Sequence, residues 1–151
     1  MRRHVYTLDV GLLEGLIEEE FVEENPKVSR KIEIQGHQTL EQLHKKIFEA
    51  FDREEEQAYE FQMDRESVYP DRRYVKAEIE EEEEDECGLV EDTSIQELKL
   101  NQGDVFGYLF DYNDLWIHQV KVLSIKDQQE GAVYPRLVEK LGNSPPQYPE
   151  W

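Results

Sequence analysis

The sequence lacks the short motifs that accompany much enzymatic chemistry. It contains no glycine-rich phosphate loop, no CxxC pair and no HExxH motif. It has a single cysteine, Cys87, so an internal disulfide is excluded. This cysteine ends the run IEEEEEDEC, where neighbouring carboxylates disfavour the reactive thiolate. These absences argue against nucleotide-binding, zinc-peptidase and thiol-dependent classes.

Long apolar runs are also missing. No stretch approaches the roughly 18 apolar residues of a membrane span. The opening MRRHVYTLDV has two arginines but neither the apolar core nor the cleavage site of a secretory signal. We therefore expect a cytoplasmic protein that does not interact with membranes.

Basic side chains are scarce relative to acidic ones. Lys and Arg number 17 against 36 Asp and Glu, which gives a formal net charge of -19. Such a field repels phosphate backbones, so direct nucleic-acid binding is not expected. The charge instead suits a basic protein partner, a cation or mimicry of a nucleic acid, although its commonest consequence is solubility.

The length of 151 residues predicts one domain, residues 1–151, with a core of its own. An acidic, solvated loop is expected at about 80–92, where like charges repel one another. A tail at about 134–151 holds four of the six prolines and is expected to be extended rather than part of a sheet. Tyr148 and Trp151 are candidates to anchor it.

Apolar alternation predicts six strands. They are HVYTLDVGL (4–12), SRKIEIQG (29–36), AYEFQM (58–63), RRYVKAEI (72–79), DVFGYLFDY (104–112) and LWIHQVKVLSI (115–125). The segment LLEGLIEEEFVEENPK (12–27) is treated as an acidic excursion, because Gly15 weakens any helix there. A single helical turn is expected at 93–98.

The main helix is predicted from TLEQLHKKIFEAF (39–51), which has apolar residues at helical spacing. Thr39 suits the N-cap, and Gln42 three residues later completes a capping box. The order of elements predicts an α+β fold: a β-grasp-like mixed sheet with one main helix, a long C-terminal hairpin and an extended Pro-rich tail. This analogy predicts the fold and no function.

The stretch YLFDYNDLWIH (108–118) concentrates the polar chemistry of the chain. If Asn113 and Asp114 form a two-residue hairpin turn, Asp111 lies opposite Trp116. Asp111 and His118 then become diagonal neighbours on one face, where a carboxylate and an imidazole can meet.

This stretch supports two interpretations. An Asp–His pair can orient a general base or hold a metal-binding imidazole. Alternatively, Asp caps backbone amides in a turn and His satisfies a buried partner. The second is favoured, because no Ser or Cys nucleophile lies nearby and no second His sits at metal-ligand spacing.

The candidate site residues follow from this stretch and from the predicted helix. His44 joins the hairpin in a metal site only if the helix crosses the same face of the sheet. The catalytic candidates are Asp111, Asp114, His118 and His44; the metal-ligand candidates are Asp111 and His118; the binding candidates are Tyr108, Tyr112 and Trp116.

The chain resembles the plasmid pRiA4b ORF-3-like family from about Tyr6 to Pro146. PKVSRKIEI (26–34) resembles the family's Pro-x-aliphatic-x-Arg-Arg-Ile segment, and the predicted helix carries its Leu-His pair. AYEFQM resembles its His-x-x-Phe strand, with Ala58 in place of His. Tyr134-Pro135 and Pro145-Pro146 also match, whereas Gln147-Tyr148 stand where the family usually has acidic residues.

The hairpin carries the most specific part of this resemblance. The family's Tyr-x-Tyr-Asp-Phe-Gly-Asp-x-Trp-x-His pattern is matched by Tyr108, Asp111, Asp114, Trp116 and His118. Asn113 replaces the usual Gly, a swap that predicts a positive φ at this position. The resemblance implies a prokaryotic protein, sometimes encoded next to mobile elements, and it implies no activity.

We therefore expect a non-catalytic, cytoplasmic protein-interaction module with no cofactor. Its partner is expected to be a protein that engages the acidic loops or the aromatic hairpin tip, and a basic protein would suit the charge of the chain. The alternatives are a metal-dependent hydrolase or nuclease-like enzyme that uses the Asp/His hairpin and a divalent cation, and an acidic mimic of nucleic acid.

Overall fold

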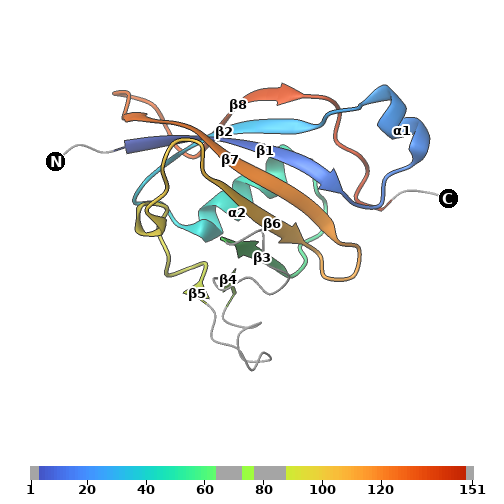
Figure 1. Cartoon of the computed structure of the whole chain (residues 1–151), viewed down its shortest axis with the longest axis horizontal. Helices are drawn as coiled ribbons and strands as arrows, with labels where there is room; N and C mark the ends of the chain where they lie inside the picture. The colour runs from blue at the N-terminus through green and yellow to red at the C-terminus, as the bar shows by residue number, and fades with distance from the viewer. Residues whose placement is uncertain (1–3, 64–72, 77–87, 149–151) are drawn as a thin grey trace.

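The computed structural model describes residues 4–63, 73–76 and 88–148. Within these residues, eight strands form one mixed sheet in the order β5-β4-β3-β6-β7-β1-β2-β8 (Figure 1). The strands are β1 His4–Glu14, β2 Ser29–Gln35, β3 Tyr59–Gln62, β4 Arg73–Val75, β5 Gly88–Leu89, β6 Val105–Phe110, β7 Trp116–Asp127 and β8 Arg136–Leu141. The helices are α1 Glu19–Glu24, α2 Leu40–Ala50 and the 3-10 turn η1 Gln96–Leu98.

The predicted α+β class is confirmed, and the sheet is mixed because β4 and β5 pair in parallel. The other neighbours in the sheet are antiparallel, including β1 with both β2 and β7. The structure does not show the β-grasp arrangement that the order of elements suggested. What it shows is a mixed eight-stranded sheet whose two long central strands, β1 and β7, run antiparallel to each other.

Helix α2 forms where the capping box was predicted, and it lies across one face of the sheet (Figure 1). The Thr39 side chain accepts a hydrogen bond from the Gln42 amide, and the Gln42 side chain accepts one from the Thr39 amide. This reciprocal pair satisfies two amide donors that the first turn of a helix leaves free. The helix then buries Leu43, His44 and Ile47 against the sheet.

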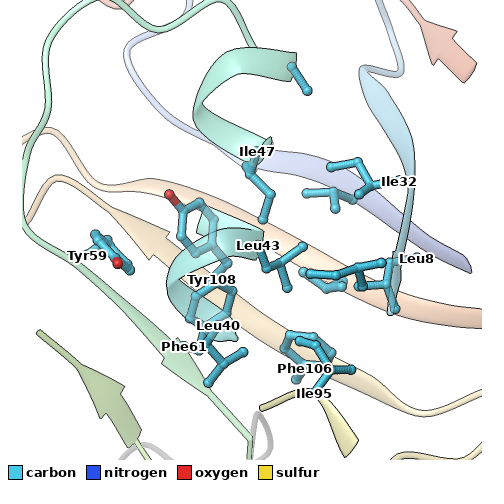
Figure 2. Packing of buried hydrophobic residues seen from close by; sticks show 14 of the residues in the cluster. Leu8, Ile32, Leu40, Leu43, Ile47, Tyr59, Phe61, Ile95, Phe106 and Tyr108 are labelled. Carbon is cyan, nitrogen blue, oxygen red and sulfur yellow. The ribbon is translucent and has the colours of Figure 1, made fainter. Parts of the chain in front are cut away.

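The core fills the space between α2 and the sheet. Leu8 of β1 and Ile32 of β2 lie at one end of it, and Tyr59 and Tyr108 lie at the other (Figure 2). Each of these four side chains is at most 1% exposed. The strands therefore present alternate residues to the helix, as the period-2 pattern predicted. The aromatic end of the core adjoins the polar residues of the candidate site.

Two predictions for irregular segments are corrected. The Pro-rich tail was expected to stay outside the sheet, but β8 pairs with β2 and forms an edge strand. The residues that form it, RLVEKL, lie between the prolines, so nothing prevents them from pairing. The expected acidic loop at 80–92 is structured at its end, where Val90 is fully buried and Gly88–Leu89 pairs with β4; its residues 80–87, with Cys87, lie outside the described residues.

The acidic excursion contains the short helix α1, at the periphery of the molecule (Figure 1). Strand β1 runs on to Glu14, two residues beyond its predicted end. Gly15 then lies against the Trp116 ring, which leaves no space for a Cβ. Among the described residues, no helix is long and apolar enough to span a membrane.

Candidate functional site

The hairpin between β6 and β7 is wider than the predicted two-residue turn. Strand β6 ends at Phe110 and β7 begins at Trp116, and these two residues are paired. Tyr108 pairs with His118, whereas Leu109 was expected there. The predicted register is therefore wrong by one residue, which moves side chains to the opposite face. Trp116 and His118 consequently lie on the core face, fully buried.

Asp111 organises the turn. Its Oδ1 accepts hydrogen bonds from the Asn113 amide at 2.9 Å and the Asp114 amide at 3.2 Å. The positive φ expected at Asn113 occurs instead at Asp111, 69°, and at Leu115, 53°. The Leu115 amide donates to the Asp111 carbonyl at 2.8 Å and closes the turn. Asp111 thus caps amides, which is the structural role weighed against catalysis.

His118 is held by two partners inside the core. Its Nδ1 lies 3.2 Å from the Tyr108 carbonyl oxygen, and its Nε2 lies 3.0 Å from Nη2 of Arg53. A carbonyl only accepts and a guanidinium only donates, so Nδ1 carries the proton and Nε2 accepts. Burial, assisted by the Arg53 charge, holds the pKa of His118 well below its usual value. The imidazole is therefore neutral.

His44 brings α2 to the same place, because the helix does cross this face of the sheet. Its Nδ1 lies 2.6 Å from the Tyr108 hydroxyl, and its Nε2 lies 2.8 Å from Oε1 of Glu56. Burial lowers the pKa of His44, and the bond to His44 lowers the pKa of Glu56. A neutral His44 thus donates from Nε2 to the Glu56 carboxylate and accepts the Tyr108 hydroxyl proton at Nδ1. Burial raises the pKa of Tyr108 well above its usual value, so the phenol keeps that proton.

Arg53 supplies the positive charge of this cluster. Its guanidinium carbon lies 5.4 Å from the ring centroid of Phe51, 5.0 Å from that of Phe110 and 4.8 Å from that of Trp116. Such faces attract a cation through their quadrupoles. The residue is only 6% exposed, and burial lowers its pKa to about 10. The side chain therefore remains a buried cation at neutral pH.

Together these residues form what we call the polar cluster: His44, Arg53, Glu56, Tyr108 and His118. Sequence analysis identified three of them, His44, Tyr108 and His118, and missed the other two. Arg53 and Glu56 lie in an exposed-looking run, DREEEQ, which carries no periodicity that would reveal a buried member. Arg53 is buried where the segment after α2 passes over the aromatic end of the core, whereas Glu56 stays exposed and directs its carboxylate to His44.

Gln147, which lies in the C-terminal tail, holds the segment after α2 in place. Its Oε1 accepts from the Glu54 amide at 2.7 Å and the Glu55 amide at 3.0 Å, and its Nε2 donates to the Glu55 carbonyl at 2.8 Å. Among the described residues of the tail, the Gln147 side chain is thus a buried anchor, being 3% exposed. Tyr148 assists through a 3.0 Å bond from Gln57, and Trp151 lies outside the described residues.

The remaining candidates occupy different environments. Asp114 lies in the turn, where partial burial and the Asp111 charge raise the pKa of its carboxyl group. Tyr112 is half-buried, whereas Tyr108 and Trp116 are buried.

Within residues 4–63, 73–76 and 88–148, no group of three or more His, Cys, Asp or Glu side chains is placed to hold a metal ion. Asp111 and His118 bind separate partners rather than each other.

Comparison with known proteins shows to which family this chain belongs. The model of the plasmid pRiA4b ORF-3-like proteins matches residues 17–148, which include the polar cluster, the hairpin and Gln147. The chain belongs to the pRiA4b ORF-3-like family. No curated protein matches the sequence. The crystal structure of MM3350 from Methanosarcina mazei Go1, a protein of unknown function, is similar with a TM-score of 0.73 and 19% identity, over 97% of this chain and 74% of that one. At this identity the likeness shows a shared fold.

Proposed function

We propose that this member of the pRiA4b ORF-3-like family is a non-catalytic cytoplasmic module that binds a basic protein partner. The observation that carries the proposal is the exposed acidic helix α1, which buries none of its residues. The hairpin motif, in this proposal, serves to build the fold that presents the helix.

The bonds inside the hairpin support the non-catalytic part of the proposal. Both ring nitrogens of His118 have partners, and the Asp111 carboxylate is used by the amides of its own turn. A general base must reach the proton that it removes from a substrate. His118 is fully buried and neutral, and the groups it reaches belong to the protein. Its bonds are those of a fold-defining residue.

Helix α1 offers a surface of one charge with apolar side chains beside it. Glu19, Glu20, Glu23 and Glu24 are exposed, and none of them forms an ion pair with another described residue. Val22 on the same helix is 47% exposed, and Leu13 at the end of β1 is 49% exposed. A basic partner would neutralise the carboxylates and cover the apolar side chains. The hairpin tip is less suited, because Tyr108 and Trp116 are buried.

Site-specific photocrosslinking tests the proposal in the native host. A photoreactive phenylalanine analogue at Val22 should capture a discrete partner of high pI. The same analogue at Val133, which is 80% exposed and far from α1 in sequence, is the matched control. The captured protein is then purified, and its affinity is measured by calorimetry. Capture at Val133 equal to that at Val22, or an acidic partner, would contradict the proposal.

A charge comparison then tests the binding surface itself. Removing the four α1 charges (Glu19→Gln, Glu20→Gln, Glu23→Gln, Glu24→Gln) should abolish binding of the captured partner at moderate salt, because the attraction is electrostatic. The control removes four exposed charges elsewhere (Glu49→Gln, Asp92→Asn, Asp127→Asn, Glu130→Gln) and should retain most of the affinity. Equal loss in both variants would indicate a response to net charge alone and would reject α1 as the site.

A further inference from the structure

Two buried arginines lie beside the same aromatic ring, and they differ in how many of their N–H groups have hydrogen-bond partners. Arg30 and Arg53 lie over Phe51, with guanidinium carbons 5.1 and 5.4 Å from the ring centroid. Arg30 donates from Nε to the Ala50 carbonyl, from Nη1 to two carbonyls and from Nη2 to the Ser144 hydroxyl, at 2.7–3.0 Å. All three of its nitrogens are therefore satisfied, as expected for a structural buried arginine.

Arg53 leaves most of its hydrogen-bonding capacity unused. Only Nη2 has a partner, the Nε2 atom of His118; Nε and Nη1 are buried and have no acceptor among the described residues. Asp111 raises the pKa of Arg53 through space, yet no ion pair joins these two side chains. A buried cation that lacks a paired anion is costly, because desolvation is not offset by a contact. Among the residues that the structure describes, no carboxylate pairs with this guanidinium.

Trp116 adds a third donor at the same place. Its ring lies against the guanidinium of Arg53, and its indole Nε1 is also buried, with no acceptor in the described part of the chain. The three unused groups are N–H donors, and none of them can accept. A ligand that satisfied all of them must therefore be an acceptor with several lone pairs. Water can fill such a site only in part, since it brings no charge.

We propose that Arg53 and Trp116 form a binding site for a small monocarboxylate. A single cation calls for a single negative charge, and the net charge of -19 opposes multivalent anions such as phosphate. A carboxylate is planar and matches the edge of the guanidinium, while the faces of Phe110 and Trp116 lie over the guanidinium itself. This inference goes beyond the interaction module and does not depend on α1.

Nitrogen-detected or proton–nitrogen NMR tests the site directly. The sequence has two tryptophans, so the indole region contains two signals, and Trp151→Phe assigns them. Formate and acetate are titrated in turn at constant ionic strength, with sodium chloride as the balancing salt. We expect a saturable shift of the Trp116 indole signal and of the Arg53 Nε–H signal. The Trp151 signal reports non-specific salt effects.

Three variants separate the carboxylate site from other causes. Arg53→Met should abolish the saturable shift of the Trp116 signal, and Arg53→Lys, which keeps the charge without the planar fork, should weaken it. Arg136→Met makes the same change at a partly exposed arginine and should leave the titration unaltered. The thermal melting temperature should rise with formate or acetate in wild type and in Arg136→Met alone.

Other outcomes would overturn the inference. A shift that grows linearly without saturation, or that persists in Arg53→Met, would indicate non-specific solvent effects. An equal saturable response to sodium chloride titrated by itself would identify a halide site rather than a carboxylate site. If Arg53→Met unfolds, the folded Arg53→Lys variant decides: an undiminished response there would show that the guanidinium does not bind the ligand.

Discussion

The two buried histidines have their tautomers fixed by their neighbours. His118 carries its proton on Nδ1 because Tyr108 offers a carbonyl there, and His44 carries its proton on Nε2 because Glu56 offers a carboxylate. Each remaining nitrogen accepts, from Arg53 and from the Tyr108 hydroxyl respectively. Protonation of His118 would turn its Nε2 acceptor into a donor that faces the Arg53 guanidinium, which cannot accept; the Tyr108 hydroxyl that faces Nδ1 of His44 can also accept. Acid should therefore weaken the folded state at His118.

Replacing His118 by Asn should change how stability depends on pH. The folded pKa of His118 is lowered, so below an unfolded value of about 6.5 the unfolded state alone takes up the proton. Wild type thus loses stability from this group as the pH falls, and the variant does not. The stability advantage of wild type should shrink by about 1.4 kcal/mol between pH 7.5 and 5.5. Urea unfolding of both proteins at the two pH values measures this.

The comparison with the variant removes effects that the carboxylates contribute to both proteins. A constant difference across this pH range would mean that the pKa of His118 is the same in the folded and unfolded states. The same substitution at the exposed His37 is the matched control for the exchange of a histidine for an asparagine.

At the scale of single residues, the sequence correctly predicted contacts between residues that are close together in the chain. Thr39 and Gln42 form their capping box because only three residues separate them. The Asp111–His118 pairing failed because a side chain changes face with each residue of register, and the turn spans residues 111–115 rather than two. Arg30 lies two residues before Ile32 on the same strand, so the two side chains point to the same face. The strand pattern could therefore have placed Arg30 in the core. Arg53 had no such pattern, since a tertiary contact alone buries it.

Among the elements, the connection after β1 and the β6–β7 hairpin depend on each other. Gly15 follows β1 and lies directly against the six-membered ring of Trp116, the first residue of β7. A side chain at this position would occupy space that the indole already fills. The glycine in the acidic segment therefore weakens a helix, as the sequence indicated, and also allows this close packing.

Gly15→Ala should destabilise the protein by about 1–3 kcal/mol, because the new methyl group must displace Trp116 in a packed core. Thermal or chemical unfolding measures the loss, and Trp fluorescence reports the displaced ring. Gly11→Ala is the matched control within β1: its Cβ would come no closer than 4.0 Å to the Gln119 carbonyl oxygen. We expect a change within about 0.5 kcal/mol there. Equal effects in the two variants would show that the collision with Trp116 does not determine the change in stability.

For the whole molecule, the charge of -19 opposes compaction. Adding sodium chloride from about 0.01 to 0.15 M shortens the screening length from about 30 to 8 Å and should raise the melting temperature. The variant without the four α1 charges should start from a higher melting temperature at low salt and respond less to added salt. Calorimetry at several salt concentrations checks both. A melting temperature that falls with salt would mean that ion pairs such as Lys31–Glu139 outweigh the repulsion.

The hydrogen bonds between Gln147 and the segment after α2 also determine when, during synthesis of the chain, this segment can be held in place. Its bond to the Glu54 amide spans 93 residues of chain. At about 5–20 residues per second, a ribosome needs roughly 5–20 seconds to make that stretch. During this interval the backbone that carries Arg53 and Glu56 lacks its hydrogen bonds to Gln147. The polar cluster is therefore completed only after Gln147 has been synthesised, at nearly the same time as the edge strand β8.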